Sequence, residues 1–233
     1  MELVNGIGFD LDHTLAIDNR LERVAFLRLL EAILAEGGRA IGTLTNEIEN
    51  IDDLLANQRR GDFSIDEAVR RFVAAHAVAP TETHVDWFRR TAVAMVDDFV
   101  VPLPGVEPTL RTLSARGIAT AVLTNGWNPL QLRKAERAGF RGTTLVSSEI
   151  GVQKPAVAAF EALVHVLGTQ TRETLYVGDD PCGDIAGASD AGLQSAWIDW
   201  EEKKYPPELR APDYRIHSFE ELLGILPERV RTP

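Results

Sequence analysis

The sequence has a single cysteine and no long hydrophobic run. Because Cys182 has no partner in the chain, an internal disulfide framework is excluded, and we expect a reducing compartment, the cytoplasm. No apolar segment approaches the roughly 20 residues that cross a membrane, and Met1-Glu2-Leu3 does not open a signal peptide. The sequence therefore predicts neither a membrane-spanning protein nor a disulfide-stabilised one.

Positive charge is also scarce. The chain has 24 lysine and arginine residues against 35 aspartate and glutamate residues, a formal net charge of −11 at pH 7. A negative excess of this size disfavours nucleic-acid backbones and anionic membranes as partners. A small anion can still bind if a metal ion or a few basic side chains form a local positive centre.

The chain is long and apolar enough for a substantial core. Its 233 residues are 45% hydrophobic and 25% charged, which is typical of a globular protein with one large or two small domains. From about residue 17 to residue 100 the pattern is helical. Apolar residues at helical spacing predict a helix over 21–34, the capping box Ser64-Ile65-Asp66-Glu67 opens another, and a third is expected over 81–99.

Strands and helices alternate after the linker Val101-Pro102-Leu103-Pro104-Gly105. Together with one near the N-terminus, the expected strands are 4–10, 118–123, 144–148, 174–177 and 195–198, and the expected helices lie around 130–138, 155–167, 183–191 and 219–226. This alternation predicts an α/β fold, a doubly wound parallel sheet with helices on both faces. The first strand precedes the helical segment, so we expect a Rossmann-like core of residues 1–16 and 101–233 with an inserted helical domain of residues 17–100.

Asp10 and Asp12 stand one residue apart just after the expected first strand. Bringing two carboxylates together costs free energy, because like charges repel and burial penalises each charge. A hard divalent cation such as Mg²⁺ offsets that cost and prefers oxygen ligands. The carboxyl ends of parallel strands are also where open α/β sheets bind their ligands. An isolated Asp-x-Asp-x-Thr is more often a polar turn, so the weight of this motif depends on a second acidic cluster later in the chain.

Two basic or polar segments follow later strands. Thr124-Asn125-Gly126 comes directly after the strand 118–123 and offers a hydroxyl, backbone amides and a glycine as an anion-binding nest, although Asn-Gly is more often a simple turn. Lys154 precedes Pro155 at the mouth of an expected helix, where its ammonium could neutralise a phosphate. A lone lysine is usually a solvated surface residue.

The second acidic cluster is Gly178-Asp179-Asp180-Pro181-Cys182-Gly183-Asp184, after the strand 174–177. Three acids in six positions are hard to explain structurally, although Asp180 or Asp184 could be a helix N-cap. A calcium-binding EF-hand is excluded at Asp10, because the sixth and twelfth positions of such a loop would be Leu15 and Leu21 instead of glycine and glutamate. No Walker loop, Gly-x-Ser-x-Gly elbow, His-Glu-x-x-His or zinc-spaced cysteine set is present.

Taken in order, the four segments resemble the four motifs of the haloacid dehalogenase-like hydrolase superfamily. The motifs are Asp10-x-Asp12-x-Thr14, Thr124, Lys154-Pro155 and Gly178-Asp179 with Asp184. The resemblance extends over nearly the whole chain, and the place of the insert resembles the helical cap of the subfamily that includes phosphoglycolate phosphatases, β-phosphoglucomutases, nucleotide 5′-phosphatases and haloacid dehalogenases. The dehalogenases lack the second acid of the first motif, so the presence of Asp12 favours the phosphatase branch.

The resemblance implies a role for each acid. Asp10 is expected to be the nucleophile that forms an aspartyl-phosphate, and Asp12 to protonate the leaving alkoxide and then deprotonate the attacking water. Mg²⁺ is the expected cofactor, with Asp10, the backbone carbonyl of Asp12, Asp179 and Asp184 as its ligands, the last directly or through water. Thr124, the amide of Asn125 and Lys154 are expected to hold the phosphate oxygens.

The expected function is therefore a magnesium-dependent phosphatase that hydrolyses a small phosphomonoester of the nucleotide monophosphate, sugar phosphate or phosphoglycolate type. A phosphomutase of the β-phosphoglucomutase type is one alternative. A non-catalytic regulatory protein that accepts phosphate is another, although a receiver domain is about half this length and has no helical insert. The substrate, the residues of the insert that select it and the oligomeric state stay open at this stage.

Overall fold

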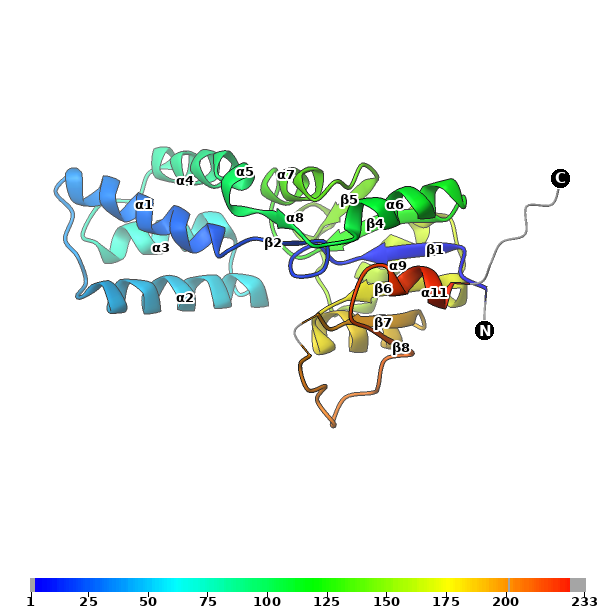
Figure 1. Ribbon diagram of the computed structural model, residues 1–233. Helices are drawn as coiled ribbons and strands as arrows, with labels where there is room; N and C mark the ends of the chain where they lie inside the picture. Colours follow the sequence, from blue (N-terminus) through cyan, green and yellow to red (C-terminus); the bar gives the residue numbers. More distant parts are fainter. Residues whose placement is uncertain (1–2, 201, 227–233) are drawn as a thin grey trace. The chain divides into compact units, whose positions relative to one another are not determined.

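A parallel sheet forms the centre of the larger of two units in the computed structural model, which describes residues 3–200 and 202–226 (Figure 1). The strands are β1 (Gly6–Phe9), β4 (Ala119–Thr124), β5 (Thr143–Val146), β6 (Thr174–Gly178), β7 (Gln194–Ile198) and β8 (Tyr214–Ile216). Their order is β5-β4-β1-β6-β7-β8, and every neighbouring pair is parallel. The doubly wound parallel sheet predicted from the sequence is confirmed.

The register of β1 determines which loops meet at the edge of the sheet. Phe9 is aligned with Val122 of β4 on one side and with Val177 of β6 on the other. The chain leaves all three strands within two residues of these positions. The segments that start at Asp10, Thr124 and Asp179 therefore leave the sheet at the same edge.

Helices cover both faces of this sheet. Helices α9 (Val157–Leu167) and α10 (Gly187–Asp190) pack on one face, and α6 (Val106–Ala115) and α11 (Glu221–Ile225) pack together over strands β4 and β8. The remaining elements of this unit are α7 (Leu130–Arg137), α8 (Ser147–Ile150), the 3₁₀ turn Thr171–Glu173, the π-helix η2 (Pro181–Ala186) and the antiparallel pair β2 (Ala16–Ile17) and β3 (Val101–Pro102).

The core explains the alternation of glycine and large residues along β1. A Cβ atom at Gly8 would lie 2.3 Å from Cδ2 of Leu163 and 2.8 Å from Cδ2 of Tyr176, so only glycine lets α9 pack closely on this strand. On the other face the ring of Phe9 stacks on that of Phe219, with centroids 5.7 Å apart. Both faces of β1 are buried, as expected for the centre of a parallel sheet.

The second unit, Asp18–Phe99, is helical. It consists of α1 (Leu21–Ala35), α2 (Leu44–Arg60), α3 (Ile65–Ala75), α4 (Glu82–Ala94) and the short α5 (Val96–Phe99), and the four longer helices run side by side in Figure 1. Phe26 lies at its centre, with its ring centroid 5.1 Å from that of Phe72 and 4.4 Å from that of Phe88. The Ser64 hydroxyl accepts a hydrogen bond from the backbone of Glu67, so one half of the predicted capping box caps α3.

Several predicted boundaries are wrong by a few residues. Ser147 and Ser148 begin α8 instead of ending a strand, and the Ser147 hydroxyl accepts a hydrogen bond of 3.0 Å from the Gly126 N–H. The helix expected over 81–99 ends at Ala94 and restarts at Val96. The helix expected around 183–191 begins as a π-helix. Strand β8 was not predicted, because its three residues are too few to show a period.

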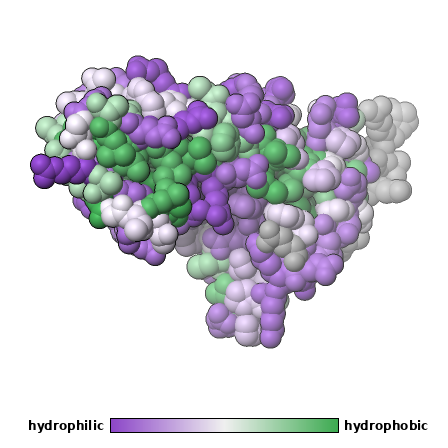
Figure 2. Space-filling view, turned by 60° about the vertical axis from the view of Figure 1, so that its left-hand side comes forward, coloured by the Kyte–Doolittle hydropathy of each residue, from purple (hydrophilic) through white to green (hydrophobic). Residues whose placement is uncertain are grey.

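The face shown in Figure 2 carries many hydrophilic residues, and hydrophobic residues gather on part of it. The exposed large hydrophobic residues of the helical unit are Leu34, Ile41 and Leu44. None of the helices that the structure describes has the length and apolar character needed to span a bilayer.

Candidate active site

Three carboxylates from distant parts of the chain meet at the edge of the sheet. Asp10 follows β1, Asp179 follows β6, and Asp184 lies in the π-helix η2. One oxygen of each lies within 4.8 Å of one oxygen of each of the others. The structure thus brings together the first and fourth of the sequence motifs.

A single lysine neutralises part of this charge. The Lys154 side chain is 5% exposed, and its Nζ donates hydrogen bonds to Oδ1 of Asp10 and to Oδ1 of Asp184, both at 2.6 Å. It also donates to the Tyr176 hydroxyl at 3.0 Å. Burial disfavours its ammonium form, but the two carboxylates outweigh this effect and raise the pKa of Lys154 well above its usual value. The lysine is therefore charged at neutral pH.

The charge of one lysine does not balance three acids. Burial raises the pKa of Asp10 to about 7, with Lys154 opposing the shift and Asp184 and Asp12 adding to it. Burial likewise raises the pKa of Asp179 to about 8, with further contributions from the negative charges of Asp10 and Asp184. The folded protein by itself thus binds protons at carboxyl groups that are ionised in the unfolded chain. This is the electrostatic state that a divalent cation relieves.

Asp12 lies outside this acidic cluster. Its side chain is 31% exposed. Oδ1 accepts a hydrogen bond of 2.9 Å from Nζ of Lys134, and Oδ2 accepts one of 3.0 Å from Nε2 of Gln131. Both partners come from α7. The two acids of the first motif therefore have different surroundings, as different chemical roles require.

The segment after β4 contributes in two ways. Thr124 is the last residue of β4 instead of the first residue after it, and its hydroxyl accepts a hydrogen bond of 2.8 Å from Gln131. The Asn125 side chain exchanges two hydrogen bonds with the backbone of Lys154: Nδ2 donates to the carbonyl at 3.0 Å, and the Lys154 N–H donates to Oδ1 at 2.9 Å. Asn125 therefore fixes the chain at the lysine that faces the acids.

The fourth motif is shaped by its glycine and its aspartates. A Cβ atom at Gly178 would lie 2.3 Å from Oδ2 of Asp184, so the absence of a side chain lets Asp184 turn back toward the strand. Asp180 is the N-cap of η2, and its side chain accepts the N–H of Cys182, which decides between the two N-cap candidates. Oδ2 of Asp184 accepts the N–H of Asp180 at 3.0 Å. Thr14 adds a hydrogen bond of 3.4 Å to Oδ1 of Asp179.

Sequence reasoning missed four residues that organise the site. Gln131 and Lys134 hold Asp12, Tyr176 links Lys154 to the carbonyl of Leu123, and Trp197 donates a hydrogen bond of 2.9 Å to the carbonyl of Asp179. Gln131 and Lys134 could have been found from the sequence, because residues three positions apart lie on the same face of a helix. Tyr176 and Trp197 are aromatic residues within strands, which a core position explains equally well.

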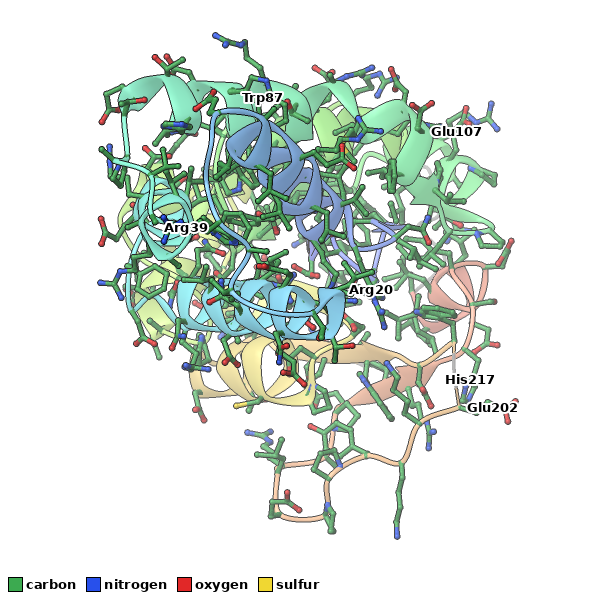
Figure 3. All side chains as sticks on the ribbon, turned by 90° about the vertical axis from the view of Figure 1, so that its left-hand side faces the viewer. Arg20, Arg39, Trp87, Glu107, Glu202 and His217 are labelled. Carbon is green, nitrogen blue, oxygen red and sulfur yellow. The ribbon has the colours of Figure 1, made fainter. Side chains whose placement is uncertain are left out.

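Hydrogen bonds and an ion pair hold the segment after β7, which lies next in the chain to Trp197, the residue that bonds Asp179. The buried carboxylate of Asp199 accepts the Lys203 N–H at 2.7 Å and is paired with Arg215 of β8, whose guanidinium lies 4.8 Å from the ring centroid of Trp197. The ring of His217 contacts the Asp199 carbonyl at 3.0 Å, and Figure 3 labels His217 together with Glu202 of the same region. These contacts hold Trp197, and through it the backbone of Asp179.

The donor set fits a hard cation. Oxygen atoms from Asp10, Asp179 and Asp184 converge, and the pKa values of two of these acids are raised in part by mutual repulsion. Carboxylate oxygens in this number suit Mg²⁺, which keeps several water ligands in addition. A charged lysine beside the acids and the hydroxyl of Thr124 nearby suit a bound anion. The described side chains therefore offer ligands of the kinds that suit a divalent cation and a phosphate group.

Comparison with known proteins points in the same direction. The sequence model of the haloacid dehalogenase-like hydrolases matches residues 4–192. A phosphoserine phosphatase of Thermus thermophilus is 34% identical over 122 residues, which make up 51% of this chain and 49% of that protein. The chain thus aligns with about half the length of this relative. A glyceraldehyde 3-phosphate phosphatase of Methanocaldococcus jannaschii is 26% identical over 235 residues, 96% of this chain and 97% of that protein.

Solved structures share the fold. The HAD-hydrolase YfnB of Bacillus subtilis, crystallised with magnesium, superimposes with a TM-score of 0.72 at 23% identity. The match covers 97% of this chain and 99% of that chain. The two chains therefore share a fold over nearly their whole length.

Proposed function

The chain belongs to the haloacid dehalogenase-like hydrolases, and on that premise we propose that it is a magnesium-dependent phosphatase that acts on a small phosphomonoester. Its membership in the family, expected from the four motifs, is confirmed by the match over residues 4–192. The observation that carries the proposal is the cluster of Asp10, Asp179 and Asp184 around Lys154, with Asp12 held apart from it. A cytoplasmic location is part of the proposal and rests on the single cysteine.

Mg²⁺ would be held by the carboxylates of Asp10, Asp179 and Asp184 and by the backbone carbonyl of Asp12. When bound, the ion supplies positive charge that stabilises the carboxylates and the phosphate as ionised groups. Lys154 contributes a second positive charge from the protein itself. Thr14 and Trp197 orient Asp179 through its side chain and its backbone.

In the proposed first step, a carboxylate oxygen of Asp10 forms a bond to phosphorus and the bond between phosphorus and the ester oxygen breaks. The carboxyl group of Asp12 gives its proton to the departing alkoxide, which leaves as an alcohol. Lys154 and the hydroxyl of Thr124 stabilise the charge on the other phosphate oxygens. The side chain of Asn125 is engaged with the backbone of Lys154, so Asn125 would bind phosphate through its backbone N–H.

In the second step, the Asp12 carboxylate takes a proton from a water molecule. The resulting hydroxide attacks phosphorus, the bond to Asp10 breaks, and inorganic phosphate leaves. The proton that Asp12 takes from water replaces the one it gave to the leaving group, so the cycle balances. A haloalkane substrate would need no proton on its leaving group, so the presence of Asp12 favours a phosphate ester over a halide.

Small phosphorylated metabolites are the proposed substrates. The relatives described above are named for phosphoserine and for glyceraldehyde 3-phosphate, each a phosphomonoester with a short carbon chain. We propose a substrate of this size class, with nucleotide monophosphates, sugar phosphates and phosphoglycolate in the same test panel.

The test is release of inorganic phosphate from this panel with and without Mg²⁺. The expected result is multiple turnovers that need Mg²⁺ and stop when a chelator is added. Formation of an isomeric sugar phosphate without net phosphate release would show a phosphomutase instead. A single phosphorylation event without turnover would show a regulatory phosphate acceptor.

Mg²⁺ is expected to raise the melting temperature more at about pH 9 than at about pH 6. The pKa values of Asp10 and Asp179 rise on folding from 3.8 to about 7 and about 8, so the metal-free folded state binds more protons than the unfolded chain in that interval. The stability of the metal-free protein therefore falls as pH rises through it, whereas Mg²⁺ binds the ionised carboxylates and offsets the loss. Differential scanning calorimetry measures both effects.

Asp179→Asn tests whether the Mg²⁺-dependent increase in melting temperature depends on the acidic cluster. It should lose most of the Mg²⁺-dependent increase in melting temperature, whereas an equal concentration of charge from KCl should not reproduce the increase in the wild type. An increase of the same size at both pH values would contradict the proposed ligands.

A further inference from the structure

The side chain of Asp12 is held at both oxygens by one helix. Lys134 Nζ bonds Oδ1 at 2.9 Å and Gln131 Nε2 bonds Oδ2 at 3.0 Å, although these residues are 122 and 119 positions away in the sequence. Because a carboxylate bonded at both oxygens cannot rotate freely about its Cβ–Cγ bond, the two contacts fix the plane of the carboxylate as well as its position.

Burial shows that these contacts are not incidental. Lys134 is 1% exposed and Gln131 is 2% exposed, whereas the side chain of Asp12 remains 31% exposed. A lysine is almost never fully buried unless a carboxylate is present to pair with it. Helix α7 therefore places the buried ammonium of Lys134 against Asp12. The exposed part of the Asp12 carboxylate remains accessible to other molecules.

Gln131 also connects Asp12 with the segment after β4. Its Nε2 lies 2.8 Å from the Thr124 hydroxyl and 3.1 Å from the Asn125 carbonyl, in addition to its contact with Asp12. The Thr124 oxygen accepts a hydrogen from Gln131, and its own O–H donates to the Asn125 carbonyl at 3.4 Å, a long contact that a phosphate oxygen would replace in the proposed complex. One amide group thus sets the geometry of both the proton-transfer group and a phosphate-binding group.

We propose that Lys134 and Gln131 are positioning residues that hold the Asp12 carboxylate in the orientation from which it exchanges protons with the leaving group and with water. This inference rests on the proposed phosphatase function. The pair touches neither substrate nor metal in this scheme and acts only through Asp12 and Thr124. Positioning matters because proton transfer requires the donor and acceptor atoms to lie within hydrogen-bond distance.

The test compares Lys134→Met with the wild type on two substrates. An alkyl phosphate needs a proton on its leaving oxygen, whereas p-nitrophenolate leaves without one. On the alkyl phosphate, kcat is expected to fall by about tenfold to a hundredfold while KM changes by less than about threefold. On p-nitrophenyl phosphate, the first step stays fast and hydrolysis of the aspartyl-phosphate slows, so a burst of about one equivalent of p-nitrophenol precedes slow turnover.

Arg133→Met is the matched control, because Arg133 lies on the same helix and forms a surface contact of 3.4 Å with Glu136. It should behave like the wild type on both substrates. Gln131→Met removes the bond to the other oxygen of Asp12 and decides the question if Lys134→Met does not fold. It is expected to give the same burst together with a higher KM, because Thr124 loses its partner as well.

The outcomes separate this inference from the proposed function. A folded Lys134→Met or Gln131→Met protein that turns over like Arg133→Met, or that loses activity equally on both substrates without a burst, overturns the positioning role alone. A wild-type protein that hydrolyses no phosphate ester overturns the function and the positioning role with it.

Discussion

Asp10→Asn is expected to reduce phosphatase kcat by roughly a thousandfold or more without loss of the fold. The amide that replaces the carboxylate has the same shape but is a poor nucleophile toward phosphorus, so no aspartyl-phosphate forms. The measurement is phosphate release under saturating substrate and Mg²⁺. Rapid acid quenching of the wild type with ³²P-labelled substrate should trap protein-bound phosphate that is absent from the variant.

The stability of Asp10→Asn follows from the charges around it. The pKa of Asp10 is raised to about 7, chiefly by burial, so the ionised carboxylate opposes folding above that pH relative to a neutral group. Lys154 keeps its contact with Asp184 at 2.6 Å in the variant. The melting temperature at about pH 8 without Mg²⁺ should therefore equal or exceed that of the wild type.

Asp86→Asn is the control for this substitution. Asp86 is an exposed aspartate on α4 in the helical unit, and the same change there should alter neither activity nor stability. A folded Asp10→Asn protein that keeps substantial activity would rule out Asp10 as the nucleophile.

Lys154→Met is expected to lose both activity and stability. The substitution leaves Asp10, Asp179 and Asp184 crowded together without the ammonium that bonds two of them. Removing one partner from a buried ion pair typically costs about 3–5 kcal/mol of the free energy of unfolding. Urea denaturation at about pH 8 without Mg²⁺ measures this loss.

The loss of unfolding free energy in Lys154→Met is expected to depend on pH. Without the lysine, the carboxylates ionise at higher pH, so the destabilisation is largest where they are charged and shrinks as pH falls and they bind protons. Lys204→Met removes an exposed lysine instead and should cost little at any pH.

A double variant separates the two roles of Lys154. In Lys154→Met/Asp184→Asn one of the crowded charges is removed as well, so part of the lost stability should return. Activity should not return, because no ammonium faces the phosphate. A Lys154→Met protein with unfolding free energy within about 1 kcal/mol of the wild type would contradict the electrostatic account of the cluster.

The part of the site that the sequence predicted consists of residues that directly follow expected strands. Asp10 and Asp179 each follow a short apolar segment, and parallel strands expose their carboxyl ends on one edge, so their convergence could be expected before any coordinates. The family followed from the same residues, because four weak motifs in the right order are together specific. The position of Lys154 beside the acids was expected on this ground too.

The partners within the site were not predictable in the same way. Two sets of contacts depend on how loops and helices pack. The Asn125 side chain bonds the backbone of Lys154, and α7 directs Gln131 and Lys134 toward Asp12. These contacts join residues 29 to 122 positions apart in the sequence. No local periodicity records a contact of that separation.

The amino-acid sequence by itself determined the alternation of strands and helices and the place of the acids near the strand ends, and it predicted a helical insert, because these features follow from hydrophobic period and turn chemistry over a few residues. Only the tertiary structure decided which donor groups form hydrogen bonds with each carboxylate. The order β4-β1-β6 places the three segments side by side, and only this arrangement sets the distances that determine charge, protonation and orientation. Electrostatic interactions depend on distance in space, and that distance is fixed by the packing of the whole unit.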